Sequence, residues 1–404
     1  MLKHFFLLVI ALFSFNILAQ NNYTISGYVQ DESSGENLIG VSVYDKQTYK
    51  GTASNQYGFY SLTLPQGDYV IKYSFIGYKS ITKNITLDKN TRLNVSLTSD
   101  AIIKEEVIVT GERLDKNVSS SNMSQAKIEV NNIKQLPVIL GEVDIMKAAQ
   151  LLPGIQSGGE GNSGLYVRGG GPDQNLILLD EAVVYNAAHL FGFFSVFNAD
   201  AIKDINIIKG GMPAEYGGRL SSVLDISMKD GNNKKYEVDG GIGLLSSRLT
   251  IQGPVQKEKS SFIVSGRRTY IDVLSKPFMS KDSPFSGSGY YFYDLTTKIN
   301  YRISDKDRLY LSGYFGRDVF NFGNTDNGIG IEIPWGNATT SLRWNHLFND
   351  KLFMNTSLIF SDYRFEFNIA QSEFELKIFS GINDWNTKVD FLYQPNQRHT
   401  IKFG

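Results

Sequence analysis

The sequence predicts a mainly β protein that ends in an antiparallel β-barrel of the membrane type. Its 404 residues include 22 Tyr, 26 Phe and 38 Gly, a composition that suits an extended β-protein. After Tyr236, long segments alternate strictly between apolar and polar side chains, as from Leu295 to Ile303. Such alternation is typical of barrel strands that face lipid on one side and a wet lumen on the other. Before them, the glycine-rich stretch Gly158 to Asp230 has the composition of a compact α/β domain that is inserted into a larger structure.

The composition excludes several kinds of active site. The formal net charge is −1, so no basic field argues for nucleic-acid binding. The chain has no cysteine, which excludes thiolate metal sites, cysteine nucleophiles and disulfides. Gly159 to Gly164 fits the pattern G-x-G-x-x-G, but a β-like stretch follows it where a dinucleotide site needs a helix. Ser124 to Lys127 fits S-x-x-K without its partner motifs. We therefore expect no enzyme activity, no catalytic residue, no cofactor and no metal ion.

Residues 1–19 are predicted to be a secretory signal peptide. Lys3 and His4 precede an apolar run that begins at Phe5, and Ala19 offers a small residue for cleavage. A membrane anchor is the alternative, but the uninterrupted apolar run is too short to span a bilayer. No later segment reaches the roughly 18 consecutive apolar residues of a spanning helix. A membrane location would therefore require a β-barrel.

Residues 20–99 are predicted to form a small β-sandwich, because short alternating strands are separated by turn signals such as Pro65 to Asp68. The segment resembles the carboxypeptidase-D regulatory-like domain. The residues that carry the resemblance are Gly27-x-Val29, Gly40-Val41, Asn55 to Tyr60, Leu64-Pro65-x-Gly67-x-Tyr69 and Ile76-Gly77-Tyr78. No zinc-binding constellation of His and Glu accompanies them, so a binding or spacer module is favoured over a peptidase.

Residues 100–122 are interpreted as a linker. It contains one short β-prone run in polar surroundings, Glu106-Val107-Ile108-Val109-Thr110. Such a run can pair as an added strand with the sheet edge of a partner, where backbone hydrogen bonds supply affinity. An ordinary strand that joins two domains is the alternative. The position of the run just ahead of the glycine-rich insert favours the first interpretation.

Residues 123–232 are assigned to the α/β insert. A helix is expected from Glu142 to the stop at Pro153-Gly154. A second, short helix is expected to begin at Asn198, an N-cap type of residue, and to run through Ile202. The expected strands are LYVRGG, NLILLDE, AVVYN, DINIIKGG and SSVLDISM.

Residues 233–404 are predicted to contain nine barrel strands: 236–244, 245–255, 260–272, 291–303, 308–320, 338–348, 352–367, 382–394 and 398–404. Short polar turns would alternate with long loops at 272–289, 321–337 and 368–383, as in outer-membrane barrels. A soluble sandwich is the alternative, since its strands alternate too. Bacterial barrels of this kind close with an even number of strands. Because the ninth strand has only begun at Gly404, we expect most of the barrel to be missing from this sequence.

This arrangement resembles a TonB-dependent outer-membrane receptor with an N-terminal regulatory-like extension. In that family the insert is a plug domain inside the barrel. The residues that match the plug motifs are Arg168, Gly169, Gly170, Asp180, Lys209, Gly210, Glu215, Tyr216, Gly217 and Arg219. The run Glu106 to Thr110 resembles the coupling (TonB) box. One position departs from the family pattern, because the usual Asp-Gly is Asp180-Glu181 here, so that turn is expected to differ.

The resemblance implies a receptor that imports a scarce nutrient, such as a siderophore, cobalamin, a glycan or a peptide. The implied location is the outer membrane of a Gram-negative cell, with the N-terminal domain in the periplasm. The implied partners are the inner-membrane TonB complex, outer-membrane lipids, an unknown ligand and, for glycans or peptides, a surface lipoprotein. A surface adhesin or structural protein and a signal-transducing receptor are the alternatives. The plug argues against an adhesin, and the β-only N-terminal segment argues against the known signal transducers.

Two sets of plug residues carry functional hypotheses. The aromatic stretch from His189 through Phe191, Phe193 and Phe194 could form a ligand-facing apex, although packing between plug and barrel wall is the more ordinary role. The charged residues Arg168, Glu215 and Arg219 could pair with the lumen wall or within the plug. Sequence alone favours neither pairing.

Overall fold

A computed structural model describes residues 21–100, 124–134, 142–159, 164–278, 288–323, 329–371 and 373–404. The predicted signal peptide and the proposed coupling box lie outside these residues. The fold is mainly β, as the sequence predicts, with three separate sheet systems. No helix among the described residues is long and apolar enough to cross a membrane.

The N-terminal part is a sandwich of two four-stranded sheets. One sheet contains β1 (Asn22–Asp31), β4 (Phe59–Pro65), β7 (Thr91–Arg92) and β8 (Val95–Leu97). The other has the order β3 (Gly51–Ala53), β2 (Ser42–Asp45), β5 (Gly67–Ser74), β6 (Ile81–Leu87). The inward positions of the alternating strands form the core, in which Ile25, Val43, Ile71 and Leu97 are fully buried. We call this unit the sandwich.

The α/β insert is built on a five-stranded mixed sheet. Its order is β13 (Ala182–Val183), β12 (Asn175–Leu179), β17 (Ser222–Met228), β16 (Ile202–Ile208), β9 (Gln125–Glu129), and only β12 and β17 pair in parallel. Smaller elements cover it: α3 (Val130–Ile133), α4 (Ile145–Gln150), the hairpin β10 (Ile155–Ser157) with β11 (Leu165–Val167), and the hairpin β14 (Ala188–His189) with β15 (Phe194–Ser195). Buried Ile and Leu side chains of β16 and β17 form its core.

One helix of the insert is confirmed and the other is wrong. The helix expected after Glu142 is α4, whose first turn is capped by Asp144, with Oδ1 accepting from Met146 N at 2.9 Å and Lys147 N at 3.1 Å. The helix expected at Asn198 is absent. The Asn198 side chain accepts from Asp200 N at 3.0 Å, which closes a tight turn, and strand β16 already begins at Ile202. An Asn that caps a turn looks the same in sequence as one that caps a helix.

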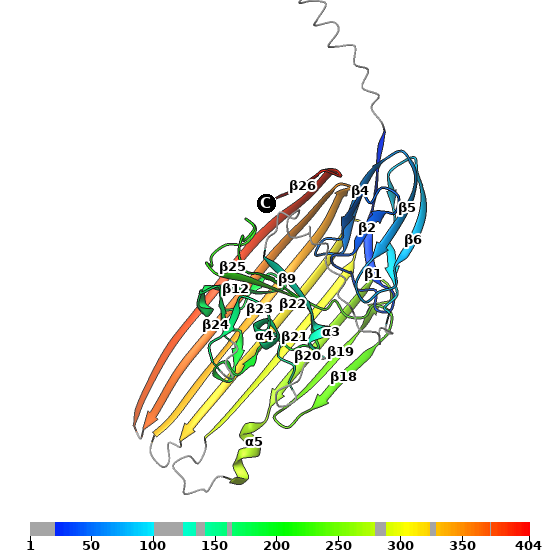
Figure 1. Cartoon of the computed structure of the whole chain (residues 1–404). Coiled ribbons are helices and arrows are strands. Elements are labelled where there is room, and N and C mark those ends of the chain that lie inside the picture. Colours follow the sequence, from blue (N-terminus) through cyan, green and yellow to red (C-terminus); the bar gives the residue numbers. More distant parts are fainter. Residues whose placement is uncertain are drawn as a thin grey trace, which may run out of the picture.

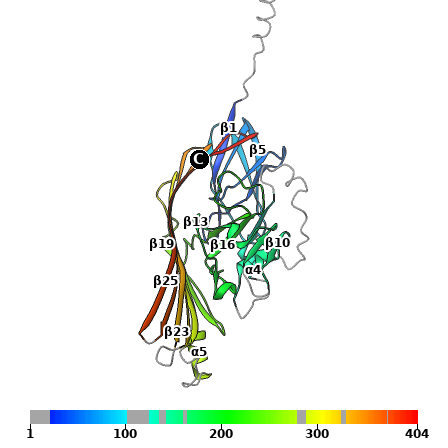
Figure 2. The ribbon, with the colours of Figure 1, turned by 90° about the vertical axis from the view of Figure 1, so that its left-hand side faces the viewer.

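The third system is one antiparallel sheet of nine strands in sequence order. The strands are β18 (Glu237–Ile242), β19 (Ser246–Gln256), β20 (Ser260–Thr269), β21 (Gly289–Arg302), β22 (Asp307–Gly323), β23 (Ile329–Asn349), β24 (Leu352–Gln371), β25 (Phe374–Asn396) and β26 (His399–Phe403). Each of the nine overlaps one of the expected strands, although several are longer than expected. We call this sheet the wall. The insert lies against one of its faces (Figure 2).

The two faces of the wall carry opposite chemistry. On β21, the side chains of Leu295 and Ile299 face outward and are each 45% exposed, whereas Asp294, Thr296 and Lys298 face the insert and are buried. A soluble sandwich would bury the apolar face instead. Apolar residues outside and polar residues inside are the arrangement of a membrane barrel wall.

Two of the predicted long loops are wrong. Residues 321–323, 329–337, 368–371 and 374–383 belong to strands, so that β23 has 21 residues and β25 has 23. Their register continues to Gly323↔Gly330 and Gln371↔Phe374. Neighbouring strands supply the pairing of these segments, which local propensity does not encode. The predicted loop at 272–289 overlaps α5 (Ile271–Ser275) and the 3₁₀ turn η3 (Lys276–Phe278).

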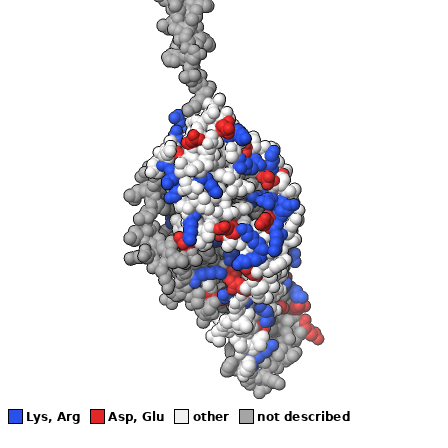
Figure 3. Space-filling model, turned by 90° about the vertical axis from the view of Figure 1, so that its right-hand side faces the viewer, with Lys and Arg blue, Asp and Glu red and all other residues white. Residues whose placement is uncertain are grey.

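The sandwich sits at the end of the wall where the short turns lie, and α5 marks the opposite end (Figure 1). Lysines and arginines are intermixed with acidic side chains on the face seen in Figure 3. Such a mixture is typical of a solvated surface.

Candidate functional site

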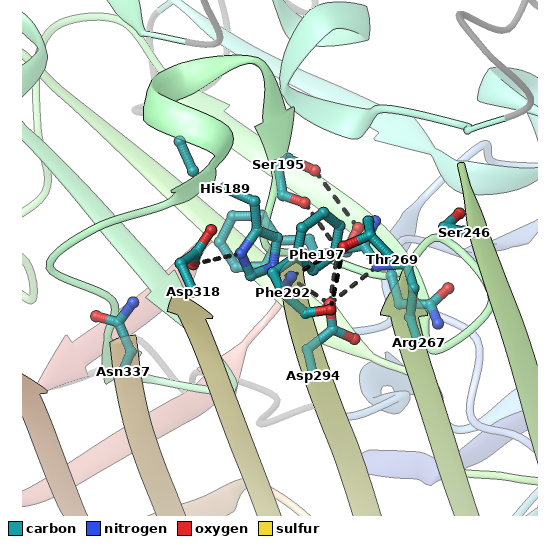
Figure 4. A network of polar contacts seen from close by, with 12 residues as sticks. His189, Ser195, Phe197, Ser246, Arg267, Thr269, Phe292, Asp294, Asp318 and Asn337 are labelled. Carbon is teal, nitrogen blue, oxygen red and sulfur yellow. Dashed lines mark hydrogen bonds and ion pairs between the residues drawn. The ribbon is translucent and has the colours of Figure 1, made fainter. Parts of the chain in front are cut away.

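The contact between insert and wall contains a buried network of charged side chains around His189 (Figure 4). Strand β14 carries the imidazole to the wall, where it stacks on the ring of Phe292 with centroids 3.9 Å apart. Its Nδ1 lies 2.7 Å from Asp318 Oδ2, and its Nε2 lies 3.2 Å from Asp294 Oδ2. His189 is 1% exposed. One histidine of the insert therefore joins strands β21 and β22 of the wall.

Arg267 on β20 extends the network. Its Nε and Nη2 donate to Asp294 Oδ2 at 2.9 and 2.7 Å, and its Nη1 lies 3.3 Å from Glu142 Oε2 of the insert. Nη2 also donates to the Ser195 carbonyl of the insert at 2.9 Å. The guanidinium is thus satisfied from both sides of the contact, which is the condition under which a buried charge is tolerated.

Three carboxylates, those of Glu142, Asp294 and Asp318, face one guanidinium in this network. This imbalance favours a protonated His189. Burial lowers the pKa of His189, but the charge of Asp318 and hydrogen bonds to Asp294 and Asp318 outweigh burial, and the pKa lies above its ordinary value. The Arg267 charge opposes this increase without reversing it.

This pKa shift predicts that the insert binds the wall more tightly at mildly acidic pH. Because the folded-state pKa of His189 is raised, its contribution is fully present below the unfolded value of about 6.5 and is lost as pH rises through the folded value. Hydrogen exchange of β14 and β15 should therefore speed up as pH rises from 6 to 9, after correction for intrinsic rates. His189→Gln should flatten this dependence; an unchanged dependence would assign it to another group.

A second ion cluster lies nearer the sandwich. Lys298 on β21 places its Nζ 2.9 Å from Asp180 Oδ2, 2.9 Å from Asp230 Oδ1 and 3.0 Å from the Met228 carbonyl. The lysine side chain is 2% exposed. Asp180 also accepts from Met228 N at 2.9 Å, so this carboxylate ties the β12–β13 turn both to β17 and to the wall.

A third cluster pairs Asp200 of the insert with Lys134 at 2.6 Å and with Arg248 of the wall at 2.7 Å. Burial raises the pKa of Asp200, but the hydrogen bond and charge of Lys134 and the charge of Arg248 outweigh burial and hold the pKa below its ordinary value. All three clusters join the insert to the wall through buried polar contacts.

Comparison with known proteins explains this geometry. Residues 25–109 match the model of the CarboxypepD_reg-like domain, and residues 112–222 match that of the TonB-dependent receptor plug domain. The chain therefore contains a plug domain of the TonB-dependent receptor type behind a CarboxypepD_reg-like domain. The insert is accordingly called the plug below.

Curated proteins named TonB-dependent receptors are similar to part of this chain. A TonB-dependent receptor of Formosa agariphila is 30% identical over 231 residues, which cover 54% of this chain and 22% of that protein. The TonB-dependent receptor SusC of Bacteroides thetaiotaomicron is 29% identical over 252 residues, covering 58% of this chain and 24% of that protein. The chain thus spans less than a quarter of the length of either relative. The ferric enterobactin receptor of Pseudomonas aeruginosa aligns with a TM-score of 0.46 at 16% identity, over 67% of this chain and 46% of that one.

The glycine motifs of the plug shape its loops. Gly169 has a φ of +87°, and a Cβ on Gly210 would lie 2.6 Å from Arg168 Nη1. Arg168 Nη2 in turn donates to Ser124 Oγ at 2.8 Å, and Lys209 Nζ donates to the Pro153 carbonyl at 2.8 Å. These groups therefore hold loops of the plug to one another.

The remaining motif residues make contacts either within the plug or with the wall. Tyr216 donates its hydroxyl to Asp225 at 3.0 Å, within the plug. Arg219 donates to the neighbouring Gly218 carbonyl at 2.8 Å. Glu215 reaches the wall, 3.5 Å from Lys402 Nζ. Gly217, beside them, has open space where a Cβ would stand.

The four aromatic-stretch residues lie in different surroundings. His189 and Phe194 are buried against the wall, at 1% and 2% exposure. Phe193 lies under the Lys147 ammonium, 4.5 Å from the ring centroid. Phe191 is 63% exposed and contacts the ring of Trp335, with centroids 4.8 Å apart.

Sequence reasoning missed the wall residues of the ion clusters, above all Arg267, Asp294 and Lys298. A signal was present: Asp294 and Lys298 occupy positions of one parity on a strand whose other face is apolar. Charged residues on the lumen side of an alternating strand are candidate partners for charged groups of the plug.

Proposed function

We propose that this protein is an outer-membrane receptor that imports a scarce nutrient into the periplasm with energy from the inner membrane. The observation that carries the proposal is the polar contact between plug and wall. Buried Thr296, Ser312, Asn345 and Ser357 line the inner face together with the three ion clusters. Water can replace such hydrogen bonds when the plug moves, whereas an apolar core would resist separation. This contact suits a plug that must move and return.

The proposal covers several chemical classes of nutrient. The relatives carry different names, among them a vitamin B12 transporter of Vibrio vulnificus that is 25% identical over 235 residues. Siderophores, cobalamin, glycans and peptides all remain within the proposal. Phe191 is the aromatic-stretch residue whose exposure suits contact with a ligand, and we include that role in the proposal.

The coupling mechanism is also part of the proposal. The run Glu106 to Thr110 would pair with TonB as an added strand. It stands between the last strand of the sandwich, β8, and the first strand of the plug, β9. Among the described residues, β9 is an edge strand that pairs with β16, so a pull on the segment before it would act on the edge of the plug sheet.

Proline substitution in this run tests the proposal. Val107→Pro or Val109→Pro removes a backbone N–H and fixes φ, which is incompatible with an extended ladder. We expect either change to abolish binding of the purified periplasmic domain of TonB and energy-dependent uptake, while ligand binding survives. Val118→Pro, later in the same linker, is the matched control and should leave TonB binding unchanged. Normal uptake in the Val109→Pro variant would refute the coupling-box assignment.

A further inference from the structure

One short turn of the wall receives three strands of the sandwich. Asp350, between β23 and β24, accepts from Ser26 Oγ at 2.8 Å and from Arg92 Nη2 at 3.2 Å through Oδ1. Its backbone carbonyl accepts from Ser61 Oγ at 2.7 Å. Strands β1, β4 and β7 of one sandwich sheet thus converge on one short turn.

An aromatic cluster reinforces this docking. Tyr28, Tyr57 and Phe59 of the sandwich pack with Leu347 and Phe353 of the wall. The Phe353 ring centroid lies 5.1 Å from that of Tyr57 and 5.7 Å from that of Phe59. All five side chains are buried. Although the inner face of the wall is mostly polar, at this place it carries apolar side chains against which the sandwich packs.

The sandwich also touches the plug. Its loop residue Glu36 lies 3.3 Å from Lys203 Nζ and accepts from Asp230 N at 3.0 Å. The carbonyl of Ile39 accepts from Lys127 Nζ of β9 at 3.3 Å. The sandwich therefore bridges plug and wall instead of hanging from a free linker.

Sandwich, plug and wall meet at one carboxylate, that of Glu181 in the β12–β13 turn of the plug. Its Oε1 accepts from the Tyr57 hydroxyl of the sandwich at 2.9 Å and from Asn355 Nδ2 of the wall at 3.0 Å. Its Oε2 accepts from Ser357 Oγ of the wall.

The backbone at this junction is strained. Asp180 has a φ of +45° and Glu181 a φ of +75°, in the left-handed region that costs free energy for residues other than glycine. Such strain persists where the surrounding structure fixes the residue. The three hydrogen bonds of the Glu181 carboxylate supply that restraint, so a glutamate occupies a turn whose backbone alone would favour glycine.

We propose that the sandwich is an intramolecular latch on the plug. Held on the wall by Asp350 and the aromatic cluster, it fixes the β12–β13 turn through Glu181, and the plug leaves the wall only after the Tyr57–Glu181 contact breaks. The part of this proposal that concerns plug movement rests on the proposed function. The latch contact itself does not, because it exists in the resting protein.

Hydrogen exchange on the purified full-length receptor, without TonB or ligand, tests the latch. Tyr57→Phe and Glu181→Gln should each raise exchange about tenfold or more in both residues 55–59 of the sandwich and residues 180–184 of the plug. The effect must be reciprocal, because coupling between two sites is symmetric in free energy. Glu181→Gly relieves the backbone strain and removes the carboxylate, so it should still release residues 55–59.

Tyr44→Phe is the matched control, because Tyr44 lies on β2 in the other sandwich sheet and stacks on Tyr49. It should leave exchange at 180–184 unchanged. The latch is overturned if Tyr57→Phe alters only its own segment, or if Tyr44→Phe has the same effect at 180–184. Neither result bears on import, so failure of the latch and failure of the proposed function are distinguishable.

Discussion

Replacement of Arg267 by alanine should weaken the attachment of the plug by about 3–5 kcal/mol, because breaking a buried ion pair leaves uncompensated charge. Asp294 loses its guanidinium partner at 2.7 Å, and Glu142 loses its partner at 3.3 Å. The Ser195 carbonyl loses a donor as well. The denaturant dependence of hydrogen exchange in β14 and β15 measures the change in free energy of plug opening.

Arg268→Ala is the matched control for this experiment. The neighbouring arginine points to the other face of β20, where its side chain is 49% exposed and pairs with Asp272 at 3.2 Å. Exposed pairs contribute about 0–1 kcal/mol. Similar losses from the two substitutions would contradict the role assigned to the buried network.

Replacement of Lys298 by methionine is the second change with a large expected effect. It should weaken the attachment of the plug by about 3–5 kcal/mol. Methionine keeps much of the side-chain volume but leaves Asp180, Asp230 and the Met228 carbonyl without the ammonium. Exchange in β12 and β17 should rise, and the same denaturant titration gives the free energy. Lys306→Met, in an exposed turn, should change it little.

The pH dependence separates charge from packing at this site. Burial raises the pKa of Asp230, but the charges of Lys298 and Lys203 outweigh burial and hold the pKa below its ordinary value. Stabilisation by Asp230 is therefore present above about pH 4 and lost as pH falls through the folded-state pKa. If lost packing were the cause, the difference in the free energy of plug opening between wild type and Lys298→Met would be the same at pH 3 and pH 7. We expect this difference to be smaller at pH 3.

Most of the secondary structure could be predicted, since strand alternation is a local property with a period of two. It located all nine strands of the wall, and buried apolar runs located β12, β16 and β17. The errors arose where local signals are ambiguous. The segment 321–337 was expected to be a loop, and Asn198 was expected to begin a helix. Pairing between neighbouring strands and the turn closed by the Asn198 side chain gave different structures at these two places.

The sequence by itself determined the order of the parts, the inner and outer faces of the wall, and the glycine motifs that the plug domain shares with TonB-dependent receptors. Only the tertiary structure decided which charges meet. Arg267 finds Asp294 27 residues away and Glu142 125 residues away, and Tyr57 finds Glu181 124 residues away. Such pairs depend on strand register and on where the plug and the sandwich settle. The residues next to each partner encode neither the register nor this placement. Each pair joins positions far apart in the sequence, which come together only when the chain folds.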